Sequence, residues 1–186
     1  MDKKQALINA ALKLFVENGF HGTPTAKIAQ EAGVGTGTLF QYFKTKDELV
    51  IALYLQFKEE MFEFVSKHTE GKPNFKETII STISSSLNWA LDNPTKFHFI
   101  QQFHTSPYIG LVEQEVLTKQ VEPHLALIQQ GIQTGVLKTM PADLIYSLLS
   151  NQVFGVYQYI CSKSFSKSKK KEIIEKTVEM LWDMVT

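Results

Sequence analysis

The sequence predicts an all-α protein with a small N-terminal unit of three helices and a larger helical body. Apolar residues recur at steps of three and four over nearly all of the 186 residues, which is the spacing of an amphipathic helix. Glycine and proline interrupt this pattern at short intervals, and no segment shows the strict alternation of a half-buried strand. We expect an N-terminal domain at 1–48 and a body at 49–186.

The composition is that of an ordinary soluble globular protein. Apolar residues make up 44% and charged residues 20% of the chain, a balance too apolar for disorder. No apolar run reaches the roughly 20 residues of a membrane span, and the first residues lack the apolar core of a signal peptide. Cys161 is the only cysteine, so no internal disulfide forms. These features predict a cytoplasmic protein with no membrane contact.

The first two helices follow from their apolar stripe and their ends. Residues 3–18 place one apolar stripe on a helix, and Gly19 stops it. Thr25 is predicted to cap a short helix over 25–32, which Gly33 ends. The first stripe consists of Leu7, Ile8, Ala11, Leu14 and Phe15.

A third short helix is expected over 36–43, and a long helix follows it. Asp47 and Glu48 lie in the first turn of this long helix, where negative charge suits the helix dipole. The long helix breaks at TEGKPN, residues 69–74. Further helices are predicted at 75–92, 95–105, 108–134 with Pro123 kinking or splitting it, 142–162 and 170–185.

Three glycines at alternate positions, Gly33, Gly35 and Gly37, raise two alternatives. A dinucleotide-binding loop needs G-x-G-x-x-G directly after a strand, and a Walker loop ends in Gly-Lys-Ser or Gly-Lys-Thr. Neither the spacing nor the helical context here fits. A turn between two helices fits better, because glycine adopts the left-handed conformation without a steric penalty. Residues 25–43 are therefore predicted to form a helix-turn-helix, whose second helix enters the DNA major groove.

This arrangement assigns an inner and an outer side to the segment. The small Ala29, on the first helix of the motif, lets the second helix cross close to the first. Gly37 lets the second helix approach DNA closely. Lys46 is expected to hold a phosphate together with the free N–H groups at the start of the next helix. The inner residues are Ile28, Val34, Leu39 and Phe43, and the outer residues are Thr36, Thr38, Gln41 and Tyr42.

Three segments closely resemble the TetR family of bacterial transcriptional repressors. They are AALKLFVENGF, TAKIAQEAGV and GTLFQYFKTKDEL, and they cover most of residues 6–49. The resemblance implies a homodimer of all-α subunits with three DNA-binding helices, a connecting helix and a variable ligand-binding body. It also implies a repressor that leaves its operator when a small-molecule effector binds, so we expect no enzymatic activity and no cofactor.

Matching positions to the family's motif assigns roles to seven residues. Thr25 and Lys46 are expected to hold phosphates, and Tyr42 is expected to touch the DNA backbone. The residues expected to meet the major groove are Thr36, Gly37, Thr38 and Gln41. The sequence departs from the family at Gly35 and Thr36, where many members have serine or a basic residue. It also departs at Phe40, where tyrosine is usual. Phe40 therefore lacks the hydroxyl for a phosphate hydrogen bond that is common in the family.

The basic residues are all lysine, 19 in number. The commonest specific contact to guanine comes from arginine or lysine, and the expected recognition helix over 36–43 contains neither. Gln41 can pair with adenine, and the threonine methyl groups suit the thymine methyl. One hypothesis is an inverted-repeat operator whose directly read positions are mostly A·T. The other explanation is an AT-rich genome that encodes lysine in place of arginine, and both stay open.

Two C-terminal segments, residues 142–162 and 170–185, are candidates for the dimer contact. Their amphipathic patterns alone fit an ordinary core, but the family resemblance favours a four-helix bundle between two copies. Gly155 permits close approach of helices. Two-fold pairing would place the two recognition helices about 34–36 Å apart.

The body is rich in aromatic residues with polar groups among them, which is typical of a ligand pocket. Each such residue taken singly also fits a simple core. The effector-binding candidates are Trp89, Phe99, Phe103, His104, Tyr108, Gln152 and Tyr157.

Other chemistry has little support. The histidines lack metal-site spacing, and no nucleophile motif is present. Two alternatives remain: a nucleotide-binding enzyme that uses the Gly33–Gly37 loop, and a helical interaction module that has lost DNA binding. The second is kept open by weak charge, since six lysines minus five acidic residues up to Glu48 leave a balance of +1.

Overall fold

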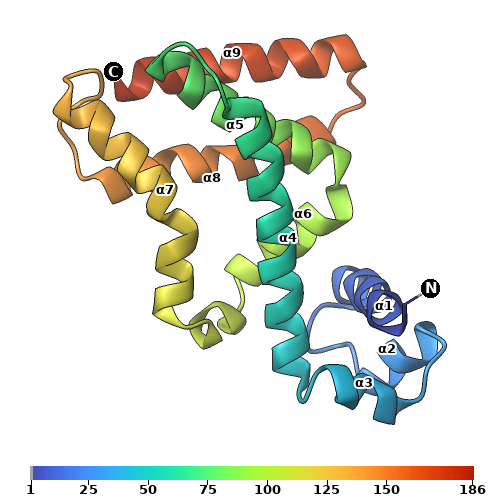
Figure 1. Ribbon diagram of the computed structural model, residues 1–186. Coiled ribbons are helices and arrows are strands. Elements are labelled where there is room, and N and C mark those ends of the chain that lie inside the picture. Colours follow the sequence, from blue (N-terminus) through green and yellow to red (C-terminus); the bar gives the residue numbers. More distant parts are fainter. Residues whose placement is uncertain (1) are drawn as a thin grey trace. The chain divides into compact units, whose positions relative to one another are not determined.

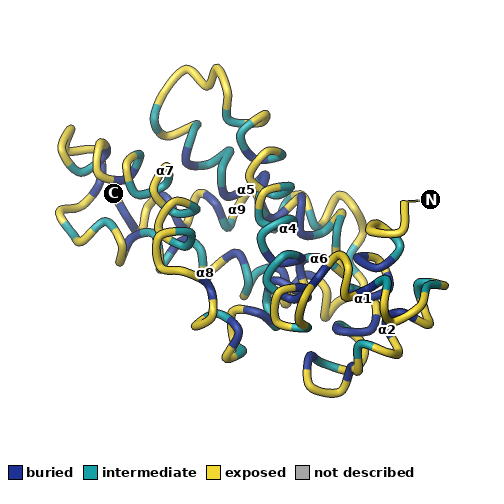
Figure 2. Tube along the Cα trace, turned by 60° about the horizontal axis from the view of Figure 1, so that its bottom comes forward, coloured by how far each residue is buried: buried dark blue, intermediate teal, exposed yellow. Residues whose placement is uncertain are grey.

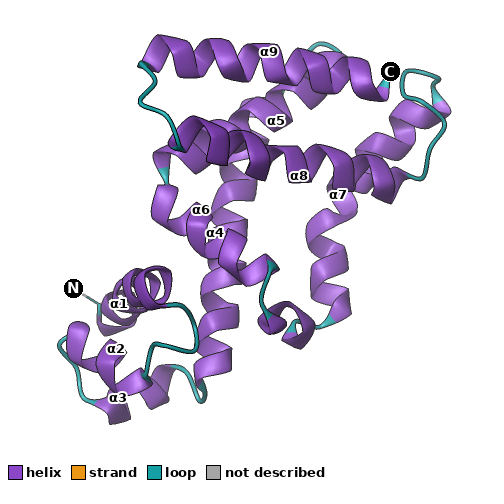
Figure 3. Ribbon diagram, turned by 180° about the vertical axis from the view of Figure 1, so that it is seen from behind, coloured by secondary structure: helices purple, strands orange, loops and turns teal. Residues whose placement is uncertain are grey.

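The structure, a computed structural model, describes residues 2–186 as helices joined by short turns (Figure 1). No strand occurs among these residues (Figure 3), so the all-α prediction is confirmed. The elements are α1 (Lys3–Asn18), α2 (Thr25–Glu31), α3 (Thr36–Tyr42), α4 (Lys46–Thr69), α5 (Phe75–Asp92), α6 (Pro94–His104), the 3-10 helix η1 (Pro107–Leu111), α7 (Gln114–Gln133), α8 (Ala142–Cys161) and α9 (Lys167–Val185).

Most predicted helix bounds agree with the structure, and one segment is different. The predicted helix over 108–134 is in fact η1 followed by α7, and Pro123 lies inside α7 without splitting it. η1 forms separately because Ser106 caps it: the Ser106 hydroxyl accepts a hydrogen bond from Tyr108 N at 3.3 Å. Pro107 then takes the first helical position, where its missing N–H costs little.

The prediction that Thr25 caps α2 is wrong. Pro24 occupies the cap position, no side chain caps this helix, and Thr25 is its first helical residue. The preceding Thr23 is fully buried instead. Its hydroxyl lies 2.8 Å from Gly19 O and 3.0 Å from Leu14 O, so it ties the loop before α2 to the end of α1.

The chain forms two compact units by packing. The first unit comprises the chain up to Glu60 together with Asn93–Glu113, and the second comprises Met61–Asp92 with Gln114–Thr186. The first unit therefore contains α6 and η1 as well as the N-terminal helices. The domain boundary at residue 48, which separates DNA-binding from effector-binding parts, stays a prediction.

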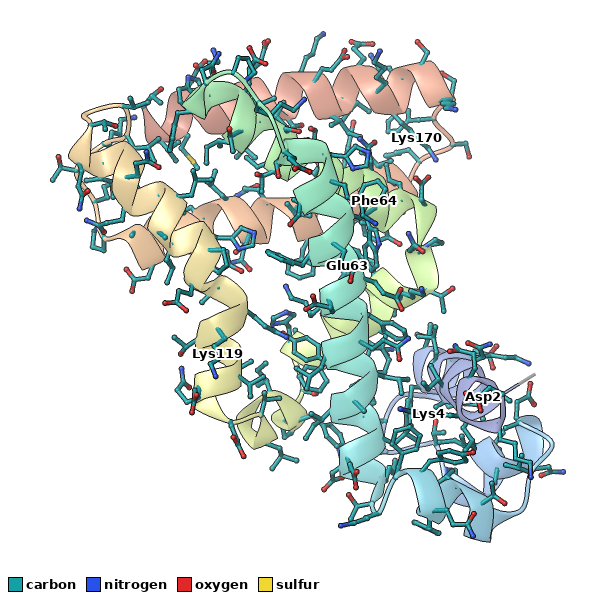
Figure 4. The ribbon with its side chains drawn as sticks, viewed as in Figure 1. Asp2, Lys4, Glu63, Phe64, Lys119 and Lys170 are labelled. Atoms are coloured by element: carbon teal, nitrogen blue, oxygen red, sulfur yellow. The ribbon has the colours of Figure 1, made fainter. Side chains whose placement is uncertain are left out.

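α1 has a defined cap at each end. The Asp2 carboxylate accepts a hydrogen bond from Lys4 N at 3.2 Å (both residues are labelled in Figure 4). Gly19 ends the helix with a φ of 72°, and its N–H bonds Phe15 O at 2.9 Å. These caps satisfy backbone groups that a helix end otherwise leaves without partners.

The core of the first unit is a cluster of aromatic rings around Phe20. The Phe20 ring centroid lies 5.4 Å from those of Phe15 and Phe99 and 5.1 Å from that of Tyr108. Tyr54 of α4 stacks on Phe103 of α6 with centroids 4.0 Å apart. Figure 2 marks the buried positions along α1, α4 and α6 in dark blue. α6, although distant in sequence, therefore shares one core with the N-terminal helices.

In the second unit, α5 packs against both α8 and α9, and α7 packs against α8. The Phe75 and Trp182 rings bring α5 and α9 together with centroids 6.3 Å apart. A Cβ at Gly131 would lie 2.4 Å from the Phe75 ring and 2.8 Å from Leu137, so α7 needs glycine there. Within residues 2–186, no helix combines the length and apolar character needed to cross a membrane.

Candidate nucleic-acid interface

The turn between α2 and α3 is built around Gly33. Gly33 has a φ of 67°, which confirms the predicted left-handed conformation. Its N–H bonds Gln30 O at 3.0 Å, and Val34 N bonds Ala29 O at 3.0 Å. These two bonds close the end of α2 in the manner of a glycine-terminated helix. A residue with a Cβ would be strained at Gly33, so the turn that aims α3 depends on glycine.

α3 has one buried side and one exposed side. Leu39 is 0% exposed and Phe43, directly after the helix, is 3% exposed. Both join Ile28 and Ala29 of α2 in the core. Of the residues predicted to meet DNA from α3, Thr36, Gly37, Gln41 and Tyr42 are exposed, and Thr38 is half-buried.

The glycines at the start of α3 face open space. A Cβ added at Gly35 or Gly37 would meet no atom within 4 Å, and neither residue has a positive φ. Nothing inside this protein therefore requires glycine at either position. A close external surface, such as a DNA groove, would explain the absence of a side chain.

Two aromatic side chains are exposed on α3. Phe40 is 43% exposed and Tyr42 is 40% exposed. The Tyr42 hydroxyl is able to donate a hydrogen bond to a phosphate, whereas Phe40 offers only an apolar ring.

The start of α4 is capped by two hydrogen bonds that the sequence analysis missed. Glu48 N donates to Thr45 Oγ1 at 3.0 Å, and Lys44 N donates to Glu48 Oε2 at 2.8 Å. The pattern T-x-x-E at residues 45–48 is a capping signal and could have revealed this pair. The amides of Lys46 and Asp47 have no acceptor within a helix because of their position in its first turn. With the half-buried Lys46 they form a candidate phosphate site.

The charge of the head, which we define as residues 2–48, is partly neutralised internally. Lys13 of α1 pairs with Glu31 of α2 at 2.6 Å. The hydrogen bond and the opposite charges raise the pKa of Lys13 and lower that of Glu31. Because both side chains are exposed, this pair adds little stability. It does remove one lysine from those free to meet DNA.

A second contact joins η1 to the start of α4. Burial raises the pKa of Tyr108, and the charge of Asp47 together with a hydrogen bond to its side chain raises that pKa further. Tyr108 is 8% exposed and also packs on Phe20. This side chain therefore connects the aromatic core with the helix turn that contains Lys46.

The structure distributes the predicted effector residues over both units. The first unit holds Phe99, Phe103, His104 and Tyr108, and the second holds Trp89, Gln152 and Tyr157. Phe99 and Phe103 are fully buried, Trp89 and Tyr157 are buried, and Gln152 is exposed. Burial and a hydrogen bond to Cys161 raise the pKa of Tyr157 to about 12. Their role in lining a pocket stays a prediction.

The two helices predicted to form the dimer leave large apolar side chains exposed. On α8, Leu144 is 43% and Tyr159 is 52% exposed, and on α9, Met180 is 71% and Met184 is 38% exposed. This supports a partner surface, although the dimer itself stays a prediction. In the described part of the chain, no three His, Cys, Asp or Glu side chains are placed to hold a metal ion.

Comparison with known proteins points in the same direction. The family model described as "Bacterial regulatory proteins, tetR family" matches residues 7–53. The fatty acid metabolism regulator protein of Bacillus subtilis (strain 168) is 27% identical over 177 residues, which cover 92% of this chain and 88% of that protein. A TetR family transcription regulator from Shewanella sp. PV-4, known from a crystal structure, is 32% identical to this chain. The match covers 100% of this chain and 98% of that protein's chain, with a TM-score of 0.89. The structure of FadR from Bacillus subtilis in complex with stearoyl-CoA, at 21% identity, covers 97% of this chain and 96% of its own, with a TM-score of 0.74.

Proposed function

As a member of the TetR family of bacterial transcriptional regulators, this chain is a DNA-binding regulator, and we propose that it acts as a homodimeric repressor on an inverted-repeat operator. The observation that carries this proposal is the exposed side of α3. The positive φ of Gly33 forms the turn before this helix, and no atom lies within 4 Å of a Cβ placed at Gly37. Gly33 thus belongs to the turn of a helix-turn-helix and Gly37 to its second helix, which removes the reason to propose a nucleotide-binding loop there. Its DNA target would place the protein in the cytoplasm.

Base recognition is proposed for the outer residues of α3. Gln41 would pair with adenine, and the methyl groups of Thr36 and Thr38 would pack on thymine methyls. Tyr42, Lys46 and Thr25 would hold the phosphate backbone and fix the register without reading sequence. The operator's directly read positions would therefore be mostly A·T.

Selection of binding sites from random DNA tests this proposal. We expect an inverted repeat with A·T-rich half-sites, and G·C-rich half-sites would contradict it. Gln41→Ala is expected to relax discrimination at one position per half-site by about 1–3 kcal/mol. Gln133→Ala, an exposed glutamine at the end of α7, serves as the matched control and should leave the selected sequence unchanged.

The dimer is proposed to form through α8 and α9. Leu144→Lys and Met180→Lys each place a charge among the exposed apolar side chains of these helices, where a buried unpaired charge is costly. Light scattering is expected to show a dimer for the natural chain and a monomer for the double variant. A natural chain that is monomeric at micromolar concentration would contradict the proposal.

The effector is proposed to be a long-chain acyl compound. The support comes from the Bacillus subtilis relative named as a fatty acid metabolism regulator, which matches 92% of this chain. An effector releases DNA only by preferring the conformation that binds DNA weakly, typically by about 1–3 kcal/mol. Stearoyl-CoA is therefore expected to weaken operator binding by about fivefold or more in a mobility-shift assay. Undiminished binding at saturating stearoyl-CoA would exclude this effector.

The Tyr108–Asp47 contact is proposed to transmit the effect to α4. Tyr108→Phe removes the hydroxyl whose pKa Asp47 raises but keeps the ring in the aromatic core. We expect operator affinity without effector to stay near its natural value, while more effector is needed for release. An unchanged release curve would show that the Tyr108 hydroxyl has no part in the coupling.

A further inference from the structure

Lys58 is a cation inside the first unit for which the protein provides no acid. It lies on α4 and is half-buried. Within residues 2–186, no carboxylate lies within ion-pair distance of Lys58, although six other lysines have such partners. A desolvated ammonium group without a counterion is costly, so its presence calls for a compensating ligand or partner.

The neighbouring acids on α4 are committed elsewhere. Glu60 pairs with Lys96 of α6 and also accepts a hydrogen bond from Gln56 Nε2 at 3.0 Å. Glu59 is exposed to solvent. The residues one turn from Lys58 on its own side of the helix are Tyr54 and Phe62, neither of which is acidic. Lys58 therefore remains the uncompensated charge on this side of α4.

Two hydrogen-bonding side chains of α6 belong to the same neighbourhood. His104 Nε2 lies 3.5 Å from Tyr54 Oη, one helical turn before Lys58 on α4. Gln101 lies one turn before His104 on the same side of α6. The Gln101 Nε2 atom is buried and has no hydrogen-bond partner among the described residues. A buried amide donor without a partner is rare in folded proteins.

The electrostatics place Lys58 and His104 near each other. Burial lowers the pKa of Lys58. Burial, followed by the positive charge of Lys58, lowers the pKa of His104 to about 4 even though part of this residue is exposed. At neutral pH His104 is therefore an uncharged imidazole, which keeps one N–H donor. The cluster is rich in donors, carries one positive charge and contains no acid.

We propose that Lys58, Gln101 and His104 form the binding site for the negatively charged group of the effector, a carboxylate or a phosphate. The cation would supply the charge, and the amide and imidazole N–H groups would supply directed hydrogen bonds, which are stronger to an ionised acceptor. This inference rests on the proposed function, because it assigns the recognition of the charged end of an acyl effector. A site of this kind would bind amphiphiles with an anionic oxygen headgroup more tightly than neutral lipids of equal chain length.

Three probes with the same chain separate the headgroups: dodecanoate, dodecyl phosphate and the neutral dodecanol, each added below its aggregation threshold. Binding to the full-length protein is measured by calorimetry for the natural chain, Lys58→Met, Lys58→Arg and Lys67→Met. Lys67 is an exposed lysine near the end of the same helix and provides the matched control. Circular dichroism checks that each variant is folded, and the titration of His104 in the natural chain, described below, keeps the test informative if Lys58→Met unfolds.

We expect Lys58→Met to weaken the binding of at least one anionic probe about tenfold or more while dodecanol binding is unchanged. Lys58→Arg and Lys67→Met should bind all probes nearly as the natural chain does. The probe that loses affinity identifies the headgroup as a carboxylate or a phosphate. An NMR titration should also show that this probe raises the pKa of His104 from about 4, because a nearby anion stabilises the imidazolium.

Three outcomes overturn the inference: equal loss of anionic and neutral probes in Lys58→Met, no loss at all, or no binding of either anion to the natural chain. Operator binding without any probe is measured on the same preparations. If the natural chain binds its operator while an overturning outcome is found, this site is rejected and the repressor function stands. If it binds no duplex, the proposed function fails independently of the probe results.

Discussion

Replacing Gly37 by alanine should stabilise the protein and weaken its binding to DNA. A Cβ at this position meets no atom within 4 Å, and Gly37 has no positive φ, so alanine introduces neither a clash nor backbone strain. Alanine is favoured over glycine in a helix interior by about 1 kcal/mol, and by less in the first turn, where Gly37 lies. We expect a gain of about 0.5 kcal/mol, or about 1–2 °C in the melting temperature for a chain of this size.

The same methyl group should be harmful in the complex. If α3 lies along base edges at Gly37, the added atom forces the helix outward and lengthens its base contacts. Losing one well-formed base contact costs about 1–3 kcal/mol, which corresponds to roughly fivefold to 150-fold in affinity. Opposite signs for stability and for DNA affinity cannot arise from a variant that is simply misfolded.

Fluorescence anisotropy on the selected operator and differential scanning calorimetry measure the two quantities. Gly110→Ala is the matched control, because Gly110 is also exposed, without positive φ and surrounded by open space. It should leave operator affinity unchanged. The assignment of α3 as the reading helix is refuted if Gly37→Ala binds the operator as tightly as the natural chain, or if Gly110→Ala loses as much affinity.

Three further outcomes are expected. Gly33→Ala and Gly71→Ala replace glycines with φ of 67° and 71° and should each cost about 1 kcal/mol of stability. Calorimetry checks that the two variants lose equal stability, and anisotropy should show weaker operator binding only for Gly33→Ala. Lys46→Ala should reduce the slope of log affinity against log salt by about 0.9 per subunit, with Lys67→Ala unchanged in the same titration. The free energy of unfolding should fall as pH drops from 6.5 to about 4, because His104 is held neutral in the folded chain and protonates once unfolded. His104→Gln should make denaturant unfolding less steeply dependent on pH in that window, and an equal slope in the variant would contradict the assignment.

Local signals predicted much of the head and its turn. α1 and the turn at Gly33 were predictable because an apolar stripe, a glycine stop and a positive-φ position are each determined by a few neighbouring residues. The start of α2 was mispredicted for a local reason as well. Thr25 matches the preferred chemistry of a cap, but Pro24 already provides the extended backbone before the helix, and the hydroxyl of Thr23 is used to close the loop.

The membership of α6 in the first unit, together with the N-terminal helices, was not predictable from pattern. Phe99 and Phe103 fit a ligand pocket or a simple core equally well, because both interpretations require buried rings at helical spacing. Which of them applies depends on Phe20 and Tyr54, residues roughly 50 to 80 positions away that supply the facing rings. The donor cluster at Lys58 was missed for the same reason, since its members come from two helices and share no motif.

The weak charge of the head limits how this protein is able to bind DNA. Of the lysines before Glu48, Lys13 is paired with Glu31, and the chain carries no arginine to replace it. Few ionic phosphate contacts then remain per subunit, so we expect backbone amides at the start of α4 and hydroxyls such as that of Tyr42 to hold much of the phosphate backbone. Non-specific binding depends almost wholly on cation release and should be weak here. Contacts to bases consequently carry a larger share of the binding free energy, which predicts a shallow salt dependence together with a high ratio of specific to non-specific affinity.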